Sequence, residues 1–522
     1  MNAPVQAGGA LYADLIIEAL TRYPDRDAFV LGDRRMRYSE AADLVTRLTR
    51  VLAAAGVGRG SAVAALSPNA PEAWLLQAAA YLVGASFSGL HPLGSVDDHV
   101  HLCDEAGVAV LLVHPRFAEV GASVAQRAGT VRRVLSIGES DLGPDVHAVC
   151  ADQPGGRPTR DPLIGAEDTA WLQYTGGTTG RPKGVMLPQR AMAAQAQAWL
   201  ASFGVPETPR YLAAGPITHA AVLPLLPTLM RGGTVVLHSA FDPGEWLATI
   251  EREHINYTFS VPTMLYAVLD TGDAPRRDLS SLRTVAYGAA PMSASRIAEA
   301  QETLGPVLLQ GYGATESAGY LASLRSDEHI PELLTSCGRP AVGVLLRLLD
   351  DDGQEVETGT VGEVCARSAG VMNGYLAQPE QTEAALRGGW LHTGDLGRFD
   401  DRGFLHIVDR AKDMIISGGF NVYPREVEDV LAAHPGVRAC AVVGVPDDRW
   451  GEAVRAYVVA REAGGGSELA NELIALVRQR KGAHHAPKSV ELLDELPVTT
   501  VGKIDKKALR ARTWTGLGRQ VN

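Results

Sequence analysis

The stretch that decides the fold follows the apolar segment Thr169-Ala170-Trp171-Leu172 and reads Tyr174-Thr175-Gly176-Gly177-Thr178-Thr179-Gly180-Arg181-Pro182-Lys183-Gly184-Val185. Glycine tolerates positive φ angles and lets consecutive backbone N–H groups turn toward an anion, while threonine hydroxyls add further donors. The lysine supplies a mobile positive charge. An ordinary surface turn seldom combines so many glycines and threonines with a Pro-Lys-Gly close. The stretch therefore predicts a loop that binds the phosphates of a nucleotide triphosphate.

This loop differs from the common strand-loop-helix ATPase loop, in which lysine directly follows the last loop glycine and precedes Ser or Thr. Here Arg181-Pro182 intervene and Gly184 follows the lysine. The stretch instead resembles the phosphate loop of the adenylate-forming superfamily, which contains acyl-CoA synthetases, peptide-synthetase adenylation domains and firefly luciferase. The chain departs from that pattern at Gly177, where the family usually has serine. The resemblance implies ATP contacts from Thr175, Gly176, Gly177, Thr178, Thr179, Gly180 and Lys183.

Further motifs of the same superfamily follow in the expected order over nearly the whole chain. They are Gln310-Gly311-Tyr312-Gly313-Ala314-Thr315-Glu316, Trp390-Leu391-His392-Thr393-Gly394-Asp395, the segment 409–428 that begins Asp409-Arg410-Ala411-Lys412, and Gly502-Lys503-Ile504-Asp505-Lys506. Any one of them could be a coincidence. The full series, on a chain of this length, resembles the fatty-acid and aryl-acid CoA ligases of the superfamily most closely.

The resemblance assigns roles that suit the chemistry of joining a carboxylate to an α-phosphate. Thr315 is expected to contact phosphate and Glu316 to hold Mg²⁺, which prefers hard oxygen ligands. Lys503 is expected to reach the carboxylate and α-phosphate oxygens, because aligned anions need a neutralising charge. His219 matches the histidine near the carboxylate, although a purely structural histidine is an equal alternative. The catalytic candidates are therefore Lys503, Thr315, Glu316 and His219.

The same resemblance implies how the nucleotide and the second substrate are held. Further ATP contacts are expected from Gly288, Ala289, Gly311, Tyr312, Gly313, Asp395 and Arg410. Tyr312 would lie against adenine, while Asp395 and Arg410 would hold the ribose. Lys412 occupies the hinge about which a small domain turns. The CoA-binding candidates are Ser417, Gly418, Gly419 and Trp450; for Trp450, a buried tryptophan at a turn is an equal alternative.

Composition fits a metabolic enzyme. A formal charge of −12 and a pI near 5.6 disfavour nucleic acid as a partner. The five cysteines show no disulfide or zinc spacing, and we find neither a signal peptide nor an apolar run long enough to span a bilayer. We therefore expect a soluble cytoplasmic protein without integral membrane contact, while its oligomeric state stays open. Arginine is the default cation, and the only lysines are Lys183, Lys412, Lys481, Lys488, Lys503, Lys506 and Lys507.

At 522 residues the chain is too long for one ordinary domain. Short apolar runs that alternate with helical patterns predict an α/β fold of largely parallel, helix-covered sheets. Polar turns at residues 353–355 and 400–403 predict a small β-rich subdomain. We expect a large domain over residues 1–408 and a small mobile α+β domain over residues 409–522, carrying the Lys412 hinge and Lys503. Asp242, before Pro243, is interpreted as a helix cap rather than as a substrate ligand.

The leading functional hypothesis is an ATP-dependent acid:CoA ligase. Such an enzyme forms an acyl-adenylate with release of pyrophosphate and then transfers the acyl group to CoA, so its small-molecule partners are a carboxylic acid, ATP and CoA, with Mg²⁺ as cofactor. One alternative keeps the adenylation but changes the acceptor, either by loading a carrier protein or by activating nitrite as ATP-dependent diazotases do. Another is a nucleotide-binding regulatory protein with a degraded site. The sequence does not reveal which acid is used.

Overall fold

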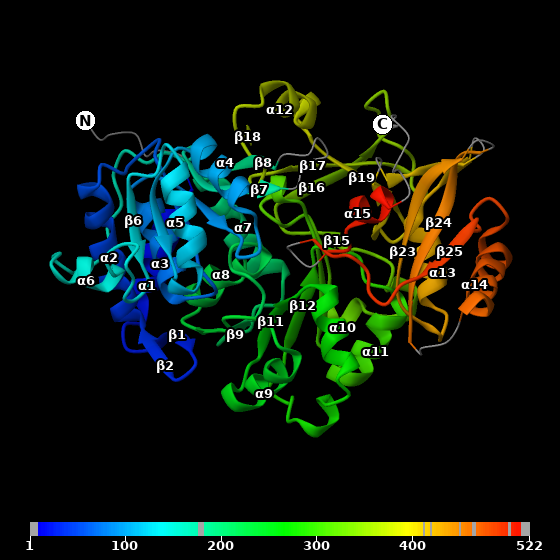
Figure 1. The fold of residues 1–522 in the computed structure, drawn as a ribbon, viewed down its shortest axis with the longest axis horizontal. Helices are drawn as coiled ribbons and strands as arrows, with labels where there is room; N and C mark the ends of the chain where they lie inside the picture. The colour runs from blue at the N-terminus through cyan, green and yellow to red at the C-terminus, as the bar shows by residue number, and fades with distance from the viewer. Residues whose placement is uncertain are drawn as a thin grey trace.

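The computed structural model describes residues 9–175, 182–410, 413–417, 420–447, 450–461, 466–499 and 503–512. Two large sheets form the N-terminal part, and a smaller antiparallel sheet and a C-terminal α+β unit follow (Figure 1). This arrangement confirms the predicted α/β class, the helix-covered parallel sheets and the small β-rich region near residues 344–410. The expected boundary at residues 408/409 stays a prediction.

The first large sheet has the strand order β15-β14-β13-β12-β11-β9-β10-β1-β2 among the described residues. The strands from β1 to β13 in this order run parallel to one another, while β2, β14 and β15 pair antiparallel at the two edges. Their bounds are β1 Asp27–Leu31, β2 Arg34–Arg37, β9 Arg210–Ala213, β10 Thr234–Leu237, β11 Tyr257–Ser260, β12 Thr284–Gly288, β13 Leu308–Tyr312, β14 Ala322–Leu324 and β15 Arg339–Pro340.

The second large sheet has the order β18-β8-β7-β4-β3-β5-β6 in the described chain. Its bounds are β3 Ala62–Leu66, β4 Ser86–Leu90, β5 Val108–Val113, β6 Arg133–Ser136, β7 Thr169–Thr175, β8 Lys183–Pro188 and β18 Gly374–Tyr375. Strand β7 runs parallel to β4, whereas β8 turns back antiparallel to β7. Thr175 and Lys183 are register partners in that pair, so both ends of the predicted phosphate loop lie together.

Helices fill the space between the large sheets and cover their outer faces (Figure 1). All of α3 is buried, because most of its residues are apolar or small and its Glu72 and Gln77 side chains have polar partners. The helices of this part are α1 Tyr12–Arg22, α2 Tyr38–Ala54, α3 Pro71–Leu82, α4 Val96–Ala106, α5 Ala118–Arg127, α6 Val146–Ala151, α7 Gln189–Ser202, α8 Leu225–Met230, α9 Pro243–Glu253, α10 Pro262–Asp270, α11 Ala294–Leu304 and α12 Pro379–Ala385. One continuous apolar core joins α1, α2, α3 and α7 to strands of both sheets.

The antiparallel sheet between the two parts has the order β16-β17-β19-β20. Its strands are β16 Val344–Leu349, β17 Gly362–Ser368, β19 Leu391–Phe399 and β20 Leu405–Arg410. The C-terminal unit consists of β21 Ile415–Ser417, β22 Phe420–Val422, β23 Val437–Asp447, β24 Gly451–Ala460 and β25 Ser489–Leu492, with α13 Pro424–Ala432, α14 Gly466–Lys481 and α15 Lys506–Ala511. It has its own apolar core of valines and leucines from α13, α14, β23 and β24. This core allows the unit to move as one body.

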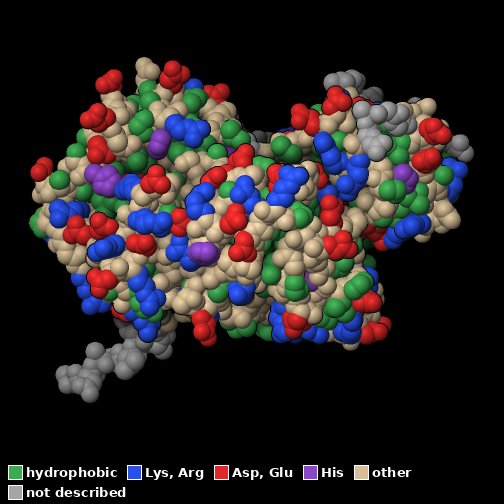
Figure 2. All heavy atoms as spheres, turned by 90° about the horizontal axis from the view of Figure 1, so that it is seen from below, with side chains coloured by type: hydrophobic (Ala, Val, Ile, Leu, Met, Phe, Trp, Pro, Cys, Tyr) green, Lys and Arg blue, Asp and Glu red, His purple; other side chains and the backbone are tan. Residues whose placement is uncertain are grey.

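The C-terminal unit contacts β20, where the N–H of Arg425 donates to Asp409 Oδ2 at 3.0 Å, and it contacts α11 of the large part. Ser295 Oγ donates a 3.2 Å hydrogen bond to the carbonyl of Ala432, and Arg461 lies 3.8 Å from Glu299. Because these contacts with α11 are polar and partly exposed, they stabilise this domain arrangement only weakly. On the face drawn in Figure 2, basic and acidic side chains are interspersed rather than gathered by sign.

Candidate active site

A cleft of about 2180 Å³ lies between the large part and the C-terminal unit. The parallel strands β9, β11, β12 and β13 direct their carboxyl ends toward it, and the loops after them supply much of its lining. Ligands of open α/β sheets bind at this edge. Of the predicted residues, the cleft is lined by Thr175, Lys183, His219, Ala289, Gly311, Gly313, Thr315, Glu316, Arg410 and Lys503. The structure therefore brings together motifs from both ends of the chain.

The backbone is tight and strained where β12 and β13 reach the cleft. A side chain on Gly288 would place its Cβ 2.2 Å from the carbonyl oxygen of Gly311, so only glycine fits there. The next residue, Ala289, has a φ of 66°, which costs a non-glycine residue about 1–2 kcal/mol. Strain of this kind gathers at functional sites, because the surrounding structure must hold it in place.

Glu316 belongs to a group of polar side chains on the cleft wall. Its Oε1 accepts a 2.8 Å hydrogen bond from the hydroxyl of Tyr375, and the Nζ of Lys183 lies 5.0 Å from the centre of the Tyr375 ring. Tyr375 thus connects the predicted metal ligand with the predicted phosphate-loop lysine. Sequence reasoning missed this residue, because only the pairing of β18 with β8 brings it to the cleft.

Asp395 lies just behind the cleft surface, with both carboxylate oxygens hydrogen-bonded. Tyr312 Oη donates to Oδ2 at 2.7 Å and Arg410 Nε donates to Oδ1 at 3.1 Å. Burial, and then the neighbouring Asp395, raises the pKa of Tyr312 well above its usual range, so its hydroxyl stays a donor. The three residues predicted to hold adenine and ribose therefore form one hydrogen-bonded unit.

Lys503 enters the cleft from the C-terminal unit. Burial in the cleft, and then the nearby Arg410, lowers its pKa, while Asp395 and Glu316 oppose this shift. Its backbone N–H donates to Thr499 Oγ1 at 3.2 Å, and the N–H of Asp505 donates to the carbonyl of Pro497 at 2.8 Å, so Lys503 and Asp505 are tied to residues 497–499. The lysine therefore shares the cleft with the acidic and ribose-binding candidates of the large part.

His219 follows β9 and lies in the same cleft. One of its ring nitrogens, Nδ1, is 2.9 Å from Thr218 Oγ1, and its ring packs edge-to-face on His91 with ring centres 5.1 Å apart. Burial, followed by the effects of His91 and Lys503, lowers the pKa of His219 to about 3. His219 is therefore a neutral imidazole at physiological pH.

The other predicted residues do not line this cleft or cannot be placed. Ser417 is buried in β21, and Trp450 packs against Lys488, whose Nζ lies 4.9 Å from the indole ring centre. Gly288 does not line the cleft, whereas its neighbour Ala289 does. The predicted residues Gly176, Gly177, Thr178, Thr179, Gly180, Lys412, Gly418 and Gly419 lie outside the described residues.

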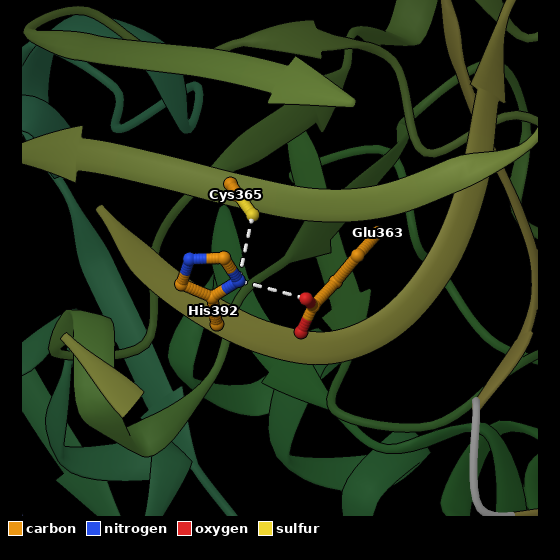
Figure 3. Close-up of side chains that lie close together, drawn as sticks. All are labelled: Glu363, Cys365 and His392. Atoms are coloured by element: carbon orange, nitrogen blue, oxygen red, sulfur yellow. Dashed lines mark hydrogen bonds and ion pairs between the residues drawn. The ribbon is translucent and has the colours of Figure 1, made fainter. Parts of the chain in front are cut away.

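A cluster of Glu363, Cys365 and His392 lies in the antiparallel sheet (Figure 3), and its His392 precedes the Gly394-Asp395 segment on β19. His392 Nδ1 is 2.7 Å from Glu363 Oε2 and 3.3 Å from Cys365 Sγ. Glu363 also accepts hydrogen bonds from Arg387 and from the N–H of Gly394, both at 3.0 Å. Burial, and then Glu363, raises the pKa of Cys365 to about 12, so the thiol keeps its proton. We interpret the cluster as a support for the Gly394-Asp395 segment.

The fold and this cleft define a nucleotide-binding α/β enzyme with two parts. The model of the AMP-binding enzyme family matches residues 17–376, and that of the AMP-binding enzyme C-terminal domain matches residues 426–503. The chain therefore belongs to the AMP-binding enzymes. This result confirms the predicted family and fold class, together with the enzyme class of an AMP-forming ligase.

Three known proteins are similar over almost the whole chain. A medium/long-chain-fatty-acid–CoA ligase, FadD8 of Mycobacterium tuberculosis, is 41% identical over 518 residues, covering 97% of this chain and 91% of that protein. A feruloyl-CoA synthase of Amycolatopsis sp. is 41% identical over 493 residues, covering 94% and 96%. The structure of the amide bond synthetase McbA from Marinactinospora thermotolerans is 37% identical with a TM-score of 0.88, covering 96% and 99%. No helix in the described ranges is long and apolar enough to cross a membrane.

Proposed function

We propose that this protein is an ATP-dependent acid:CoA ligase that makes an acyl-adenylate and then an acyl-CoA thioester. The observation that carries the proposal is the entry of Lys503, from the C-terminal unit, into the cleft that holds Glu316 and Arg410. Two relatives that match over almost the whole chain are named as a CoA ligase and a feruloyl-CoA synthase, which supports CoA as the acceptor. The acid, ATP and CoA are the small-molecule substrates.

In the first half-reaction, a carboxylate oxygen of the acid attacks the α-phosphorus of ATP and pyrophosphate leaves. Lys183 and Thr175, at the two ends of the phosphate loop, bind the triphosphate with Thr315. Asp395 and Arg410 hold the ribose, and the aromatic ring of Tyr312 lies against adenine. Lys503 neutralises the negative charge on the carboxylate and α-phosphate oxygens. Because such a donor is already in place, little reorganisation energy is needed in the transition state. The neutral His219 adds no charge beside the incoming carboxylate.

Glu316 fits the role of a Mg²⁺ ligand. It offers hard carboxylate oxygens on the cleft wall, and Tyr375 orients one of them. A bound Mg²⁺ would supply charge neutralisation for the phosphates and their leaving group. On the protein side, Tyr375 limits the rotation of Glu316 and leaves its second oxygen for the ion.

In the second half-reaction, the C-terminal unit turns about Lys412 and removes Lys503 from the cleft. The two domains that move relative to each other are residues 1–408 and 409–522, and the movement releases the weak contacts that Ala432 and Arg461 make with α11. Ser417, Gly418 and Gly419 would line the path of the pantetheine arm, and Trp450 would contact the CoA nucleotide. The thiolate of CoA attacks the acyl carbonyl and AMP leaves.

A second candidate keeps the adenylation but changes the acceptor. The similarity to an amide bond synthetase favours an amine as that acceptor, more than the carrier protein or nitrite considered from sequence. Adenylation is common to both functions, so the cleft geometry serves either one.

We place the enzyme in the cytoplasm, since its five cysteines are all free thiols.

The test is pyrophosphate release from the full-length protein, measured across aliphatic, aryl and alicyclic acids with ATP and Mg²⁺. Each acid is assayed with CoA, with a primary amine and with neither, and the products are identified by mass spectrometry. We expect acyl-CoA from at least one acid. Amide without thioester would favour the second candidate, and absence of pyrophosphate release with every acid would contradict both.

A further inference from the structure

His91 follows strand β4, and its imidazole lines the cleft beside His219. The two rings pack edge-to-face at an interplanar angle of 73°. Apolar side chains line the same cleft, among them Trp171, Phe259 and Met264. A pocket with an apolar wall and a few polar groups is typical of sites that bind organic acids, and its polar groups set the specificity.

The contacts of His91 define which of its nitrogens carries the proton. Its Nδ1 accepts a 3.1 Å hydrogen bond from the backbone N–H of Leu93. Burial, and then the neighbouring His99, lowers the pKa of His91, so the ring is neutral at physiological pH. A neutral imidazole that accepts at Nδ1 has its proton on Nε2. His91 therefore presents an N–H donor at Nε2.

This donor has no hydrogen-bond partner in the described part of the chain, and it is buried. A buried donor without an acceptor costs about 1–3 kcal/mol, so such groups are rare in native proteins and call for an explanation. A bound substrate that supplies the acceptor would remove the cost.

The turn alone does not explain the unpaired donor. His114 follows β5 and is also succeeded by proline, and its Nδ1 accepts the N–H of Arg116 at 3.1 Å. The two histidines thus close the same type of turn. His114 does not line the cleft, and its Nε2 is not one of the buried nitrogens that lack a partner. The chain therefore contains a matched control for the structural role of His91.

We propose that His91 donates a hydrogen bond from Nε2 to an oxygen in the acyl part of the acid. The enzyme then selects hydroxy, oxo or alkoxy acids over their hydrocarbon analogues. The inference rests on the proposed ligase function and specifies its substrate class. In this structure Nε2 is covered, and the acid reaches it when the ring of His91 or its neighbour His219 turns.

The test compares matched acids in ATP–pyrophosphate exchange without CoA. Suitable pairs are phenylpropenoic acids with and without a hydroxyl or methoxy group, and saturated acids with and without an oxo group. We expect the wild-type protein to prefer the oxygen-bearing member of at least one pair by about tenfold in kcat/KM, the worth of one hydrogen bond. His91→Phe keeps the ring but lacks the donor, and should abolish that preference by slowing exchange with the oxygen-bearing acid far more than exchange with its hydrocarbon analogue.

Two further variants control for the turn. His91→Asn can still accept the N–H of Leu93, but its shorter amide does not reach the Nε2 position, so it should lose the preference as well. His114→Phe should keep it.

Three results would overturn the inference: no preference in the wild-type protein, an equal loss for both members of every pair, or unchanged exchange together with a raised KM for CoA when the complete reaction is measured with CoA. The last result would assign the donor to the pantetheine amide. Exchange with the hydrocarbon acids separately reports whether the ligase function itself holds.

Discussion

The hydroxyl of Tyr375 donates a 2.8 Å hydrogen bond to Oε1 of Glu316, although 59 residues separate the two in sequence. Burial, and then Glu316, raises the pKa of Tyr375 beyond the physiological range, so the phenol is always available as a donor. The same ring lies under Lys183. One side chain thus positions the carboxylate proposed to bind Mg²⁺ and contacts the lysine proposed to bind phosphate.

Tyr375→Phe should weaken the binding of Mg²⁺ during adenylation. Loss of the orienting hydrogen bond typically costs 10- to 100-fold in metal affinity or activity, so we expect half-saturation at about tenfold higher Mg²⁺. Pyrophosphate release measured against Mg²⁺ concentration checks this. Tyr38→Phe, which removes buried hydrogen bonds to Leu229 and Gly233 far from the cleft, should leave the Mg²⁺ dependence unchanged.

Lys503→Ala should block adenylate formation far more than thioester formation. Removing one preorganised charge donor costs about 2.7–4 kcal/mol in the transition state, or about 100- to 1000-fold in rate. Synthetic acyl-adenylate plus CoA reports the second half-reaction alone, and it should proceed at near the wild-type rate. Lys507→Ala, a nearby lysine of the same cleft, is the control. Equal losses in both half-reactions would contradict the assignment.

Lys412→Pro should separate the two half-reactions by restricting the hinge. Proline fixes φ near −65°, whereas a hinge residue must adopt different backbone angles in the two domain arrangements. We expect one half-reaction to continue and the overall turnover to fall at least tenfold. Single-turnover measurements of adenylate and thioester formation check this, and unchanged turnover would argue against a hinge at this position.

The carboxylate of Glu72 provides a test of stability away from the cleft. Its side chain is 1% exposed, and Oε1 accepts hydrogen bonds from Arg34 at 2.6 Å and His147 at 2.8 Å. Burial alone would raise the pKa of Glu72, but the bonds from His147 and Arg34 outweigh it and lower the pKa to about 2. The bond to Glu72 raises the pKa of His147, against the effect of its burial.

The two pKa shifts affect stability in different pH ranges, that of Glu72 in acid and that of His147 above its ordinary pKa. The contribution of Glu72 is present above its ordinary pKa and is lost as pH falls toward about 2. That of His147 is complete below its ordinary pKa and is lost as pH rises through its raised value. His147→Gln should therefore lower the free energy of unfolding by about 1 kcal/mol at pH 6, allowing for the partial exposure of His147, and by less at pH 9. Urea denaturation at both values checks this; in a Glu72→Gln background the difference should vanish.

The sequence predicted the parts of the site whose chemistry is local. The resemblance of short motifs to those of the superfamily pointed to residues such as Thr315 and Glu316, which the structure brings into the cleft. Of the described lysines, Lys183, Lys503, Lys506 and Lys507 line the cleft, whereas Lys481 and Lys488 do not. Tyr375 and His91 were missed, because their positions depend on strand pairing and loop packing that no short pattern records. Trp450 lies away from the cleft in this domain arrangement, so its role stays a prediction.

Experiment can decide whether Asp242 acts as a helix cap or as a substrate ligand. Its Oδ1 accepts a 2.7 Å hydrogen bond from the backbone N–H of Glu245 at the start of α9, as the Asp-Pro sequence predicted, and it does not line the cleft. Asp242→Ala should therefore lower the free energy of unfolding by about 1 kcal/mol without changing the preference for any acid.

The matched variant is Asp505→Ala, because Asp505 makes the same kind of cap, accepting the N–H of Ala508 at 2.9 Å at the start of α15. Asp505 lies two residues from Lys503 and lines the cleft. Loss of this cap should loosen the position of Lys503, so Asp505→Ala should slow adenylation as well as lower stability. Denaturation and pyrophosphate exchange on both variants separate the two cases. A changed KM for amino-bearing acids in Asp242→Ala would instead assign Asp242 to the substrate site.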